Sequence, residues 1–135
     1  MWKAILLFFV ALTAQAAWGP FDAEYIKSFN GESPTLRIST FPGQFTEEVN
    51  HIAGIQVPDL HGKCVKERTL AVTARNDLKE MLEGKPLKVM VLGRDNRGRL
   101  ELVVHVDGHD VAEALVKLGD AAPYSGEGPR HDWCH

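Results

Sequence analysis

Residues 70–106, LAVTARNDLKEMLEGKPLKVMVLGRDNRGRLELVVHV, decide the fold because the period of their apolar side chains changes along the segment. Apolar residues first recur at helical spacing, and Gly84 followed by Pro86 ends the predicted helix. Beyond the proline, apolar side chains recur at every second position on both sides of the turn at residues 95–98. The segment therefore predicts a helix followed by a β-hairpin.

The flanking sequence adds three strands before this helix and one helix after the hairpin. Turn-forming or strand-breaking residues bound the predicted strands, which are 21–29, 35–41 and 49–55. After the hairpin, Asp110 caps a short helix with Glu113 three residues later, and Gly119 ends it. This order predicts a β-rich α+β fold: a five-stranded OB-fold barrel with a helix between strands 3 and 4 and a C-terminal helix.

Composition limits the classes of function. The chain has 135 residues, of which 44% are hydrophobic, which suits a single globular domain and excludes a disordered chain. Its 15 basic and 18 acidic residues give a formal charge of −3, so no positive coat attracts nucleic acid. Basic residues do crowd the hairpin, where they form either a local phosphate-binding patch or an ordinary solvated surface: Lys85, Lys88, Arg94, Arg97 and Arg99.

The first sixteen residues have the layout of a secretory signal peptide. Lys3 precedes the apolar run 4–12, and Ala14-Gln15-Ala16 resembles a cleavage site. The run is shorter than the roughly 20 residues of a membrane-spanning helix, which leaves a buried N-terminal helix as the alternative. We therefore expect residues 1–16 to be removed from an exported protein, periplasmic or secreted, that keeps no stable membrane anchor. Residues 17–135 then form the domain.

Export allows the two cysteines, Cys64 and Cys134, to pair. A disulfide between them closes a loop of about 70 residues, worth roughly 4 kcal/mol in the chain-entropy model. The alternative is a zinc site in which both cysteines join His131 and His135, although the spacing matches no common zinc signature.

Three motifs in order resemble the staphylococcal (thermo)nuclease-like family, especially its small exported bacterial members with GKC and terminal WC cysteines. These motifs are GIQVPDLHGKC at 54–64, DNRGR at 95–99 and VAEALVKLG at 111–119. The resemblance extends over residues 21–135. It implies a five-stranded barrel and, in active members, a Ca²⁺-dependent phosphodiesterase that acts on DNA and RNA. There a glutamate activates water, while Ca²⁺ and two arginines stabilise the charge of the transition state.

The resemblance places the metal-binding positions of the family at Glu32 and Gln56. Ca²⁺ takes six to eight oxygen ligands and favours anionic ones. Gln56 offers only a neutral carbonyl, and the side chain of Glu32 is one methylene longer than the aspartate of the family. The sequence therefore predicts a weakened Ca²⁺ site, with a rearranged site of Glu32 and Asp59 as the alternative.

The catalytic positions of the family fall on His51, Asp59 and Arg99, and only Arg99 is unchanged. Asp59 is one methylene shorter than the general-base glutamate. His51 stands at the position of an arginine, and its ordinary pKa near 6.5 leaves it mostly neutral at pH 7. We expect contacts to nucleic acid or phosphate from three further residues: Arg97, Tyr124 and Lys88.

These substitutions predict a degenerate nuclease site that binds nucleic acid or another partner with little or no cleavage. We expect the exported protein to be a monomer. The alternative is an active metal-dependent endonuclease that uses Glu32, Asp59 and Arg99. A third interpretation is a barrel adapted to bind protein or glycan, without a role for nucleic acid.

Overall fold

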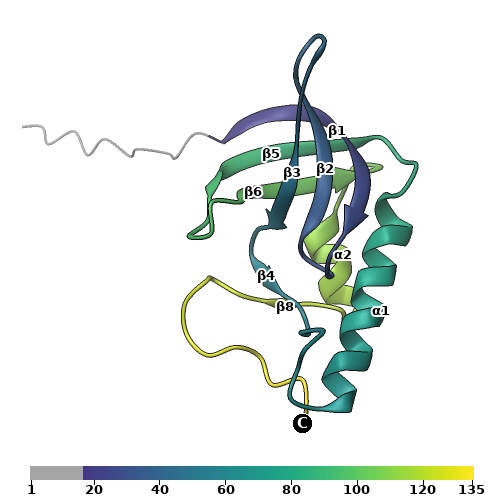
Figure 1. Ribbon diagram of the computed structural model, residues 1–135, viewed down its shortest axis with the longest axis vertical. Coiled ribbons are helices and arrows are strands. Elements are labelled where there is room, and N and C mark those ends of the chain that lie inside the picture. The colour runs from purple at the N-terminus through teal and green to yellow at the C-terminus, as the bar shows by residue number, and fades with distance from the viewer. Residues whose placement is uncertain (1–16) are drawn as a thin grey trace, which may run out of the picture.

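A computed structural model describes residues 17–135, which form one curved sheet, two helices and an extended C-terminal tail (Figure 1). The elements follow the chain in this order: β1 Trp18–Ser28, β2 Pro34–Phe41, β3 Gln44–Ile52, β4 Ile55–Gln56, α1 Val65–Leu82, β5 Leu87–Arg94, β6 Leu100–Val106, β7 His109–Asp110, α2 Val111–Leu118 and β8 Ala122–Pro123.

The main sheet closes on itself to form a barrel. Its strands have the order β3-β2-β1-β5-β6-β7, and all of these neighbours are antiparallel. A parallel pairing of Asn50–Ile52 in β3 with Leu100–Leu102 in β6 closes the ring of five long strands. The closed five-stranded barrel, with α1 between its third and fourth strands, confirms the predicted β-rich α+β fold of OB type.

The barrel interior and one face of α1 share a single apolar core. Side chains that are fully buried come from four of the five long strands and from both helices: Leu36, Ile38, Ile52, Leu78, Leu82, Leu87, Val89, Leu102, Val104, Val111 and Leu115. The loop before β2 lies directly on α1, where a Cβ on Gly31 would come within 2.9 Å of the Cβ of Ala74. Only glycine allows this approach, and it holds the loop that carries Glu32 close to the helix.

The sequence correctly predicted the end of α1 and both ends of α2, but it misplaced the third strand. Gly84, with a φ of +72°, follows the last turn of α1, and Asp110 caps α2 by accepting from the backbone N–H of Ala112 at 2.8 Å. The third strand was predicted at 49–55, but β3 runs over Gln44–Ile52, and a turn with Gly54 at φ +82° separates it from β4. The first half of β3 is exposed and has no apolar alternation, so the pattern could not reveal it.

A disulfide joins Cys64, which caps the start of α1, to Cys134 in the tail, with 6.1 Å between the two Cα atoms. The predicted pairing is confirmed, and the zinc alternative is wrong because both sulfur atoms are used in this bond. The tail also pairs β8 with β4 and buries Trp133, whose ring meets that of His131 edge to face. The tail is therefore fixed along the base of the barrel.

The predicted signal peptide lies outside the described residues, so export remains a prediction. Within residues 17–135, neither helix is long and apolar enough to cross a bilayer.

Loss of the disulfide should lower stability substantially, because the bond closes a long loop. The C64S/C134S variant should lose roughly 4 kcal/mol of unfolding free energy relative to the oxidised chain. Urea denaturation of both proteins measures the difference, and the reduced wild type is the matched control. A loss below about 1 kcal/mol would show that the tail is held by its other contacts.

A buried carboxyl group, Asp120, lies immediately after α2 and faces Asp77 of α1. Its side chain is almost fully buried, and its Oδ2 atom has no hydrogen-bond partner within residues 17–135. Burial, followed by the hydrogen bond and negative charge of Asp77, raises the pKa of Asp120 to about 7. The folded state therefore keeps a proton that the unfolded chain releases near its ordinary pKa of 3.8.

The free energy of unfolding should fall as pH rises from about 4 to about 7. Over this range the Asp120 carboxyl ionises in the unfolded state, which lowers the free energy of that state, but it stays protonated in the folded state. The Asp120→Asn variant should lose this pH dependence and should be more stable than wild type at pH 8. Urea unfolding across this range measures both effects, with Glu80→Gln on the exposed face of α1 as the control. An unchanged pH profile in Asp120→Asn would contradict the assignment.

Candidate functional site

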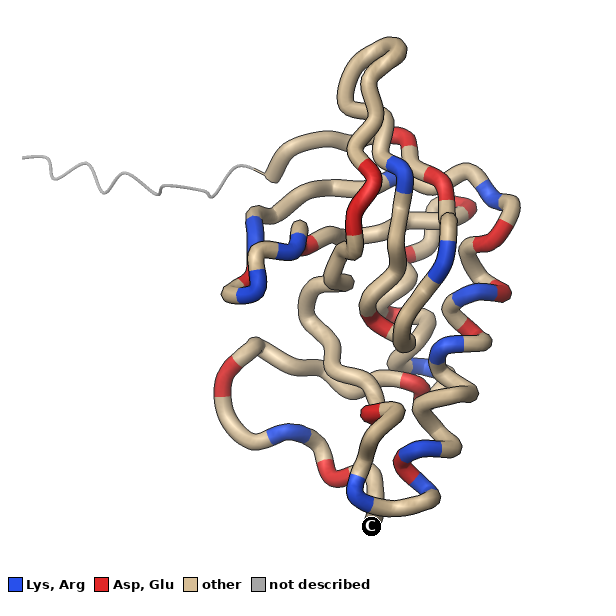
Figure 2. Tube along the Cα trace, viewed as in Figure 1, with Lys and Arg blue, Asp and Glu red and all other residues tan. Residues whose placement is uncertain are grey.

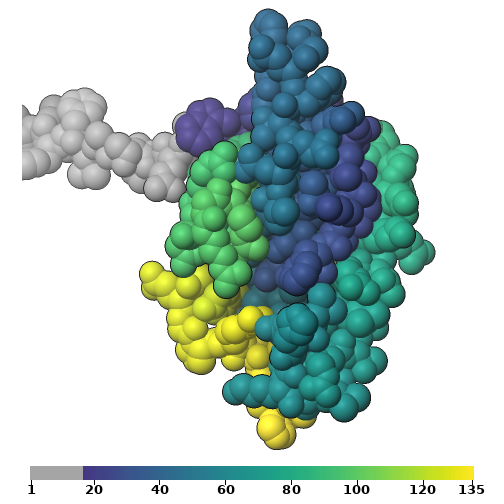
Figure 3. All heavy atoms as spheres, viewed as in Figure 1, coloured from purple at the N-terminus to yellow at the C-terminus, as the bar shows by residue number. Residues whose placement is uncertain are grey.

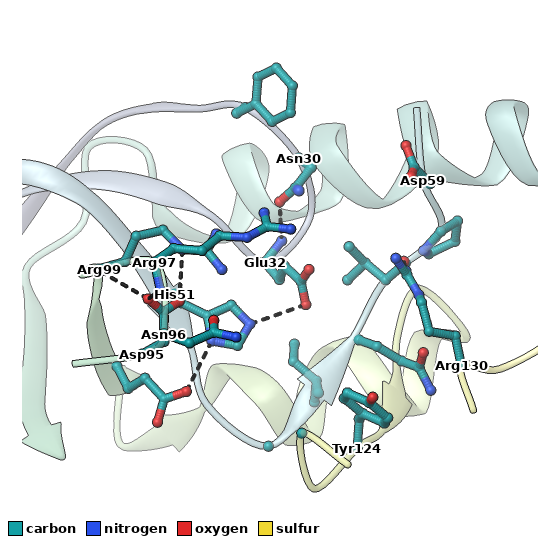
Figure 4. Close-up of a pocket in the computed structure, with 18 of the residues that line it drawn as sticks. Asn30, Glu32, His51, Asp59, Asp95, Asn96, Arg97, Arg99, Tyr124 and Arg130 are labelled. Carbon is teal, nitrogen blue, oxygen red and sulfur yellow. Dashed lines mark hydrogen bonds and ion pairs between the residues drawn. The ribbon is translucent and has the colours of Figure 1, made fainter. Parts of the chain in front are cut away.

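A cavity of about 690 Å³ opens between the barrel and the C-terminal tail. Four parts of the chain enclose it: the loop after β1, the end of β3 with β4, the turn between β5 and β6, and the tail after β8 (Figure 4). Nearly all the residues predicted for the site line this one cavity: Glu32, His51, Gln56, Asp59, Arg97, Arg99 and Tyr124. The sequence therefore identified a group of residues that the fold brings together.

Lys88 is the exception among the predicted contacts. It lies on β5 outside the cavity, and its ammonium group pairs with the carboxylate of Asp22 on β1. It stands near the start of β5, opposite His105, at the end of the hairpin away from the turn that carries Arg97 and Arg99. The structure thus separates Lys88 from the other proposed phosphate contacts.

His51 lies between two carboxylates at the centre of the site. Its Nε2 is 3.4 Å from Oε2 of Glu32, and its Nδ1 is 3.5 Å from Oε1 of Glu101. The side chains of His51 and Glu32 are only 16% and 17% exposed, so solvent screens this pair weakly. The backbone fixes the arrangement, because the N–H of Ile52 donates to the carbonyl of Glu32 and the barrel closure sets His51 beside Glu101.

The hydrogen bond with Glu32 raises the pKa of His51 above 6.5, and the negative charges of Glu32 and Glu101 raise it further. Burial and the positive charge of Arg99 lower this pKa, but their effect is smaller. The sequence analysis assigned His51 its ordinary pKa, but these carboxylates shift it towards the charged form. The site therefore favours the protonated form of the imidazole beside the carboxylate of Glu32.

Arg99 is fixed by the turn from which it projects. Its Nε donates to Oδ2 of Asp95 at 2.8 Å, its backbone N–H donates to Oδ1 of the same carboxylate, and its guanidinium also donates to Ser33. Burial alone would raise the pKa of Asp95, but these hydrogen bonds from Arg99 and the one from the Arg97 N–H lower it. Arg99 is thus held in place by an ionised partner.

Arg97 differs from Arg99 because its guanidinium makes no hydrogen bond or ion pair within residues 17–135. Only its backbone N–H is engaged, with Asp95. Exposed at the rim of the cavity, Arg97 is the cation in the site that is free to meet an anionic ligand.

The remaining two positions, Gln56 and Asp59, are occupied by the protein's own groups. Oε1 of Gln56 accepts from the backbone N–H of His131 at 3.0 Å, and Oδ1 of Asp59 accepts from the N–H of His61 at 2.7 Å. In Figure 4, Asp59 lies apart from the pair of Glu32 and His51. Each side chain thus stabilises a local structure, the tail in one case and a turn in the other.

The donor set does not fit Ca²⁺ as it is arranged. Glu32 already faces an imidazole with a raised pKa, and the oxygen of Gln56 is turned to the tail. Among residues 17–135, no group of three or more His, Cys, Asp or Glu side chains is gathered closely enough to hold a metal ion.

Charged residues of both signs line the cavity. Its lining contains four acidic residues and three arginines: Glu32, Asp59, Asp95 and Glu101, with Arg97, Arg99 and Arg130. These groups sum to a formal charge of −1, or to zero when His51 is protonated. The site therefore offers particular donors to a ligand rather than a field that attracts polyanions.

Sequence reasoning missed Glu101 and Arg130 in this site. Glu101 reaches His51 only because β3 and β6 pair in parallel, a contact between strands that are far apart in sequence. Arg130 donates to the carbonyl of Val57 at 2.8 Å from a tail without regular structure. No local pattern signals either contact, although the disulfide did predict that the tail returns to the middle of the chain.

No family model matches the chain, and no curated protein matches it.

The pKa of His51 should depend on Glu32 more than on Glu101. Glu32→Gln removes the largest contribution that raises this pKa, whereas Glu101→Gln removes a smaller one. NMR titration of the imidazole protons should therefore give the order wild type, then Glu101→Gln, then Glu32→Gln, from highest to lowest pKa. Equal pKa values in wild type and Glu32→Gln would show that the two side chains do not interact in solution.

Proposed function

We propose that this chain is an exported protein with a staphylococcal-nuclease-like barrel, and that it binds nucleic acid or another phosphate-bearing partner with little or no cleavage. The observation that carries the proposal is the contact of His51 with Glu32 and Glu101. It pairs Glu32, which stands where the family resemblance puts a metal-binding carboxylate, with an imidazole.

The other substituted positions support the same interpretation. The side-chain oxygen of Gln56 holds the tail, and one carboxylate oxygen of Asp59 closes a turn, which leaves a single oxygen of Asp59 for Ca²⁺ or for water. A general base contributes typically 10²–10⁴-fold, and one preorganised donor to an anionic transition state about 10²–10³-fold. A site that lacks the general base, one such donor and the metal keeps little of the rate acceleration that a nuclease has over the uncatalysed reaction.

Binding can survive these losses. Arg97 is exposed and has no internal partner, and Arg99 is held beside it by Asp95. Two guanidinium groups on one turn suit a phosphate, since each presents paired donors. Because the lining carries balanced charge, we expect modest affinity that depends on a few contacts and on salt concentration.

The second candidate is an active metal-dependent endonuclease, favoured by one observation: Glu32, Asp59 and Arg99 line the same cavity. A substrate phosphate and a metal ion could together separate Glu32 from His51. In that case, added metal would switch the enzyme on.

The purified protein should show little or no Ca²⁺-stimulated cleavage of single-stranded DNA or RNA. Restoration of the four family residues together (E32D/H51R/Q56D/D59E) should raise cleavage by about two orders of magnitude or more, because Arg99 and the barrel are already present. Each single reversion should do much less, since such a site acts as a unit. Cleavage of labelled oligonucleotides with Ca²⁺ or with a chelator measures both rates.

Arg97→Ala should weaken binding of the same oligonucleotides, measured by fluorescence anisotropy, whereas Lys88→Ala should not. Lys88 is the matched control, because it is a basic residue near the same hairpin but outside the cavity. Chelator-sensitive cleavage by the wild type, abolished by Arg99→Ala or Asp59→Ala, would establish the second candidate instead. Absence of any binding would favour a barrel adapted to protein or glycan.

A further inference from the structure

The hairpin of β2 and β3 projects beyond the barrel, and its end is apolar and exposed (Figures 1 and 3). We define the hairpin tip as residues 41–45, Phe-Pro-Gly-Gln-Phe. All five residues are exposed, and the rings of Phe41 and Phe45 are 66% and 58% accessible. We propose that the hairpin tip inserts into the surface of a lipid bilayer.

Insertion requires an uncharged end with charged residues below it, and the hairpin has this distribution of charge. Residues 38–46, ISTFPGQFT, contain no charged side chain, and charged residues stand immediately below them at Arg37, Glu47 and Glu48 (Figure 2). A bilayer places its acyl chains and its charged headgroups in this same order. Proteins that lie in the interface bury apolar and aromatic side chains about 5–10 Å deep while their charged groups stay with the headgroups.

Arg37 marks the depth at which the headgroups would lie. Its guanidinium lies 5.5 Å from the centre of the Phe45 ring and donates to Glu47 at 3.2 Å. The long stem of an arginine lets its guanidinium stay at the polar surface while apolar groups beside it are buried. The hairpin therefore joins an apolar end to a polar collar over a few residues.

The shape of the tip favours a bilayer over a protein partner. Two rings with this exposure offer roughly 250 Å² together, whereas a stable protein interface buries about 800 Å² on each side. The tip is narrow and convex, so a partner protein would need a matching groove, but a bilayer deforms around it. A single-stranded nucleic acid could stack on the rings, but the nearby Arg37 and Arg94 already pair with Glu47 and Glu48, so they offer little to its phosphates.

The charged residues below the tip indicate that insertion does not require anionic lipids. Arg37, Glu47 and Glu48 sum to −1 (one positive and two negative), so anionic headgroups gain nothing from this collar. Insertion then depends on apolar burial and should be almost independent of salt. The sequence also contains an apolar run at 4–12, so a chain that retains it has a second segment with affinity for a membrane. The inference does not rest on the proposed nuclease-like function.

The test uses residues 17–135, which contain the whole barrel, both helices and the disulfide. Flotation with phosphatidylcholine vesicles should carry a fraction of the wild type to the lipid layer. The F41S/F45S variant should show at least a tenfold lower partition coefficient, because it removes both rings. The matched control is Phe29→Ser, since Phe29 is 64% exposed and lies at the opposite end of β2 from the tip.

A second measurement keeps the test independent of folding. A tryptophan placed at the tip (Phe45→Trp) should shift its emission to the blue with vesicles and should be quenched by brominated acyl chains. Flotation of F41S/F45S equal to that of the wild type, or no flotation of the wild type, would overturn the proposal. So would self-association or oligonucleotide binding that depends on Phe41 and Phe45 when no vesicle binding occurs.

Discussion

The parallel pairing of β3 with β6 is the constraint on which the site depends. The three residue pairs between Asn50–Ile52 and Leu100–Leu102 close the barrel, and they also bring His51 beside Glu101. The backbone of Ile52 then holds the loop of Glu32 against the same strand. One closure therefore completes the hydrophobic core and assembles the imidazole with its two carboxylates.

In this assembly the protein satisfies its own polar groups. His51 compensates Glu32, the tail occupies Gln56, and Asp95 fixes Arg99. A site that must bind a metal or carry out hydrolysis keeps such groups available or strained for its ligand, whereas these groups are paired before any ligand arrives. That pairing favours a stable binding surface over an efficient catalyst. Arg97 remains the group with most freedom to act on a ligand.

Sequence patterns predicted the parts of this fold that local rules determine. The change of period within residues 70–106, the cap at Asp110 and the two cysteines gave the helices, the second hairpin and the disulfide. Contacts between distant segments were not predictable, because they depend on barrel closure and on the path of the tail. The strand β3 was misplaced for a related reason: its outer half pairs with β2 but buries nothing.

The central claim is that Glu32 pairs with His51, and Gln56 with the tail, in place of a bound Ca²⁺. An NMR titration with Ca²⁺ that follows the His51 imidazole in the wild type and in E32D/H51R/Q56D/D59E tests it most directly, with backbone amides of residues 30–33 as a common probe. The account predicts that wild-type amides and the raised pKa of His51 do not change at millimolar Ca²⁺, while the amides of the restored variant shift in a saturable way. Saturable Ca²⁺ binding by the wild type, with a fall in the pKa of His51, would contradict it.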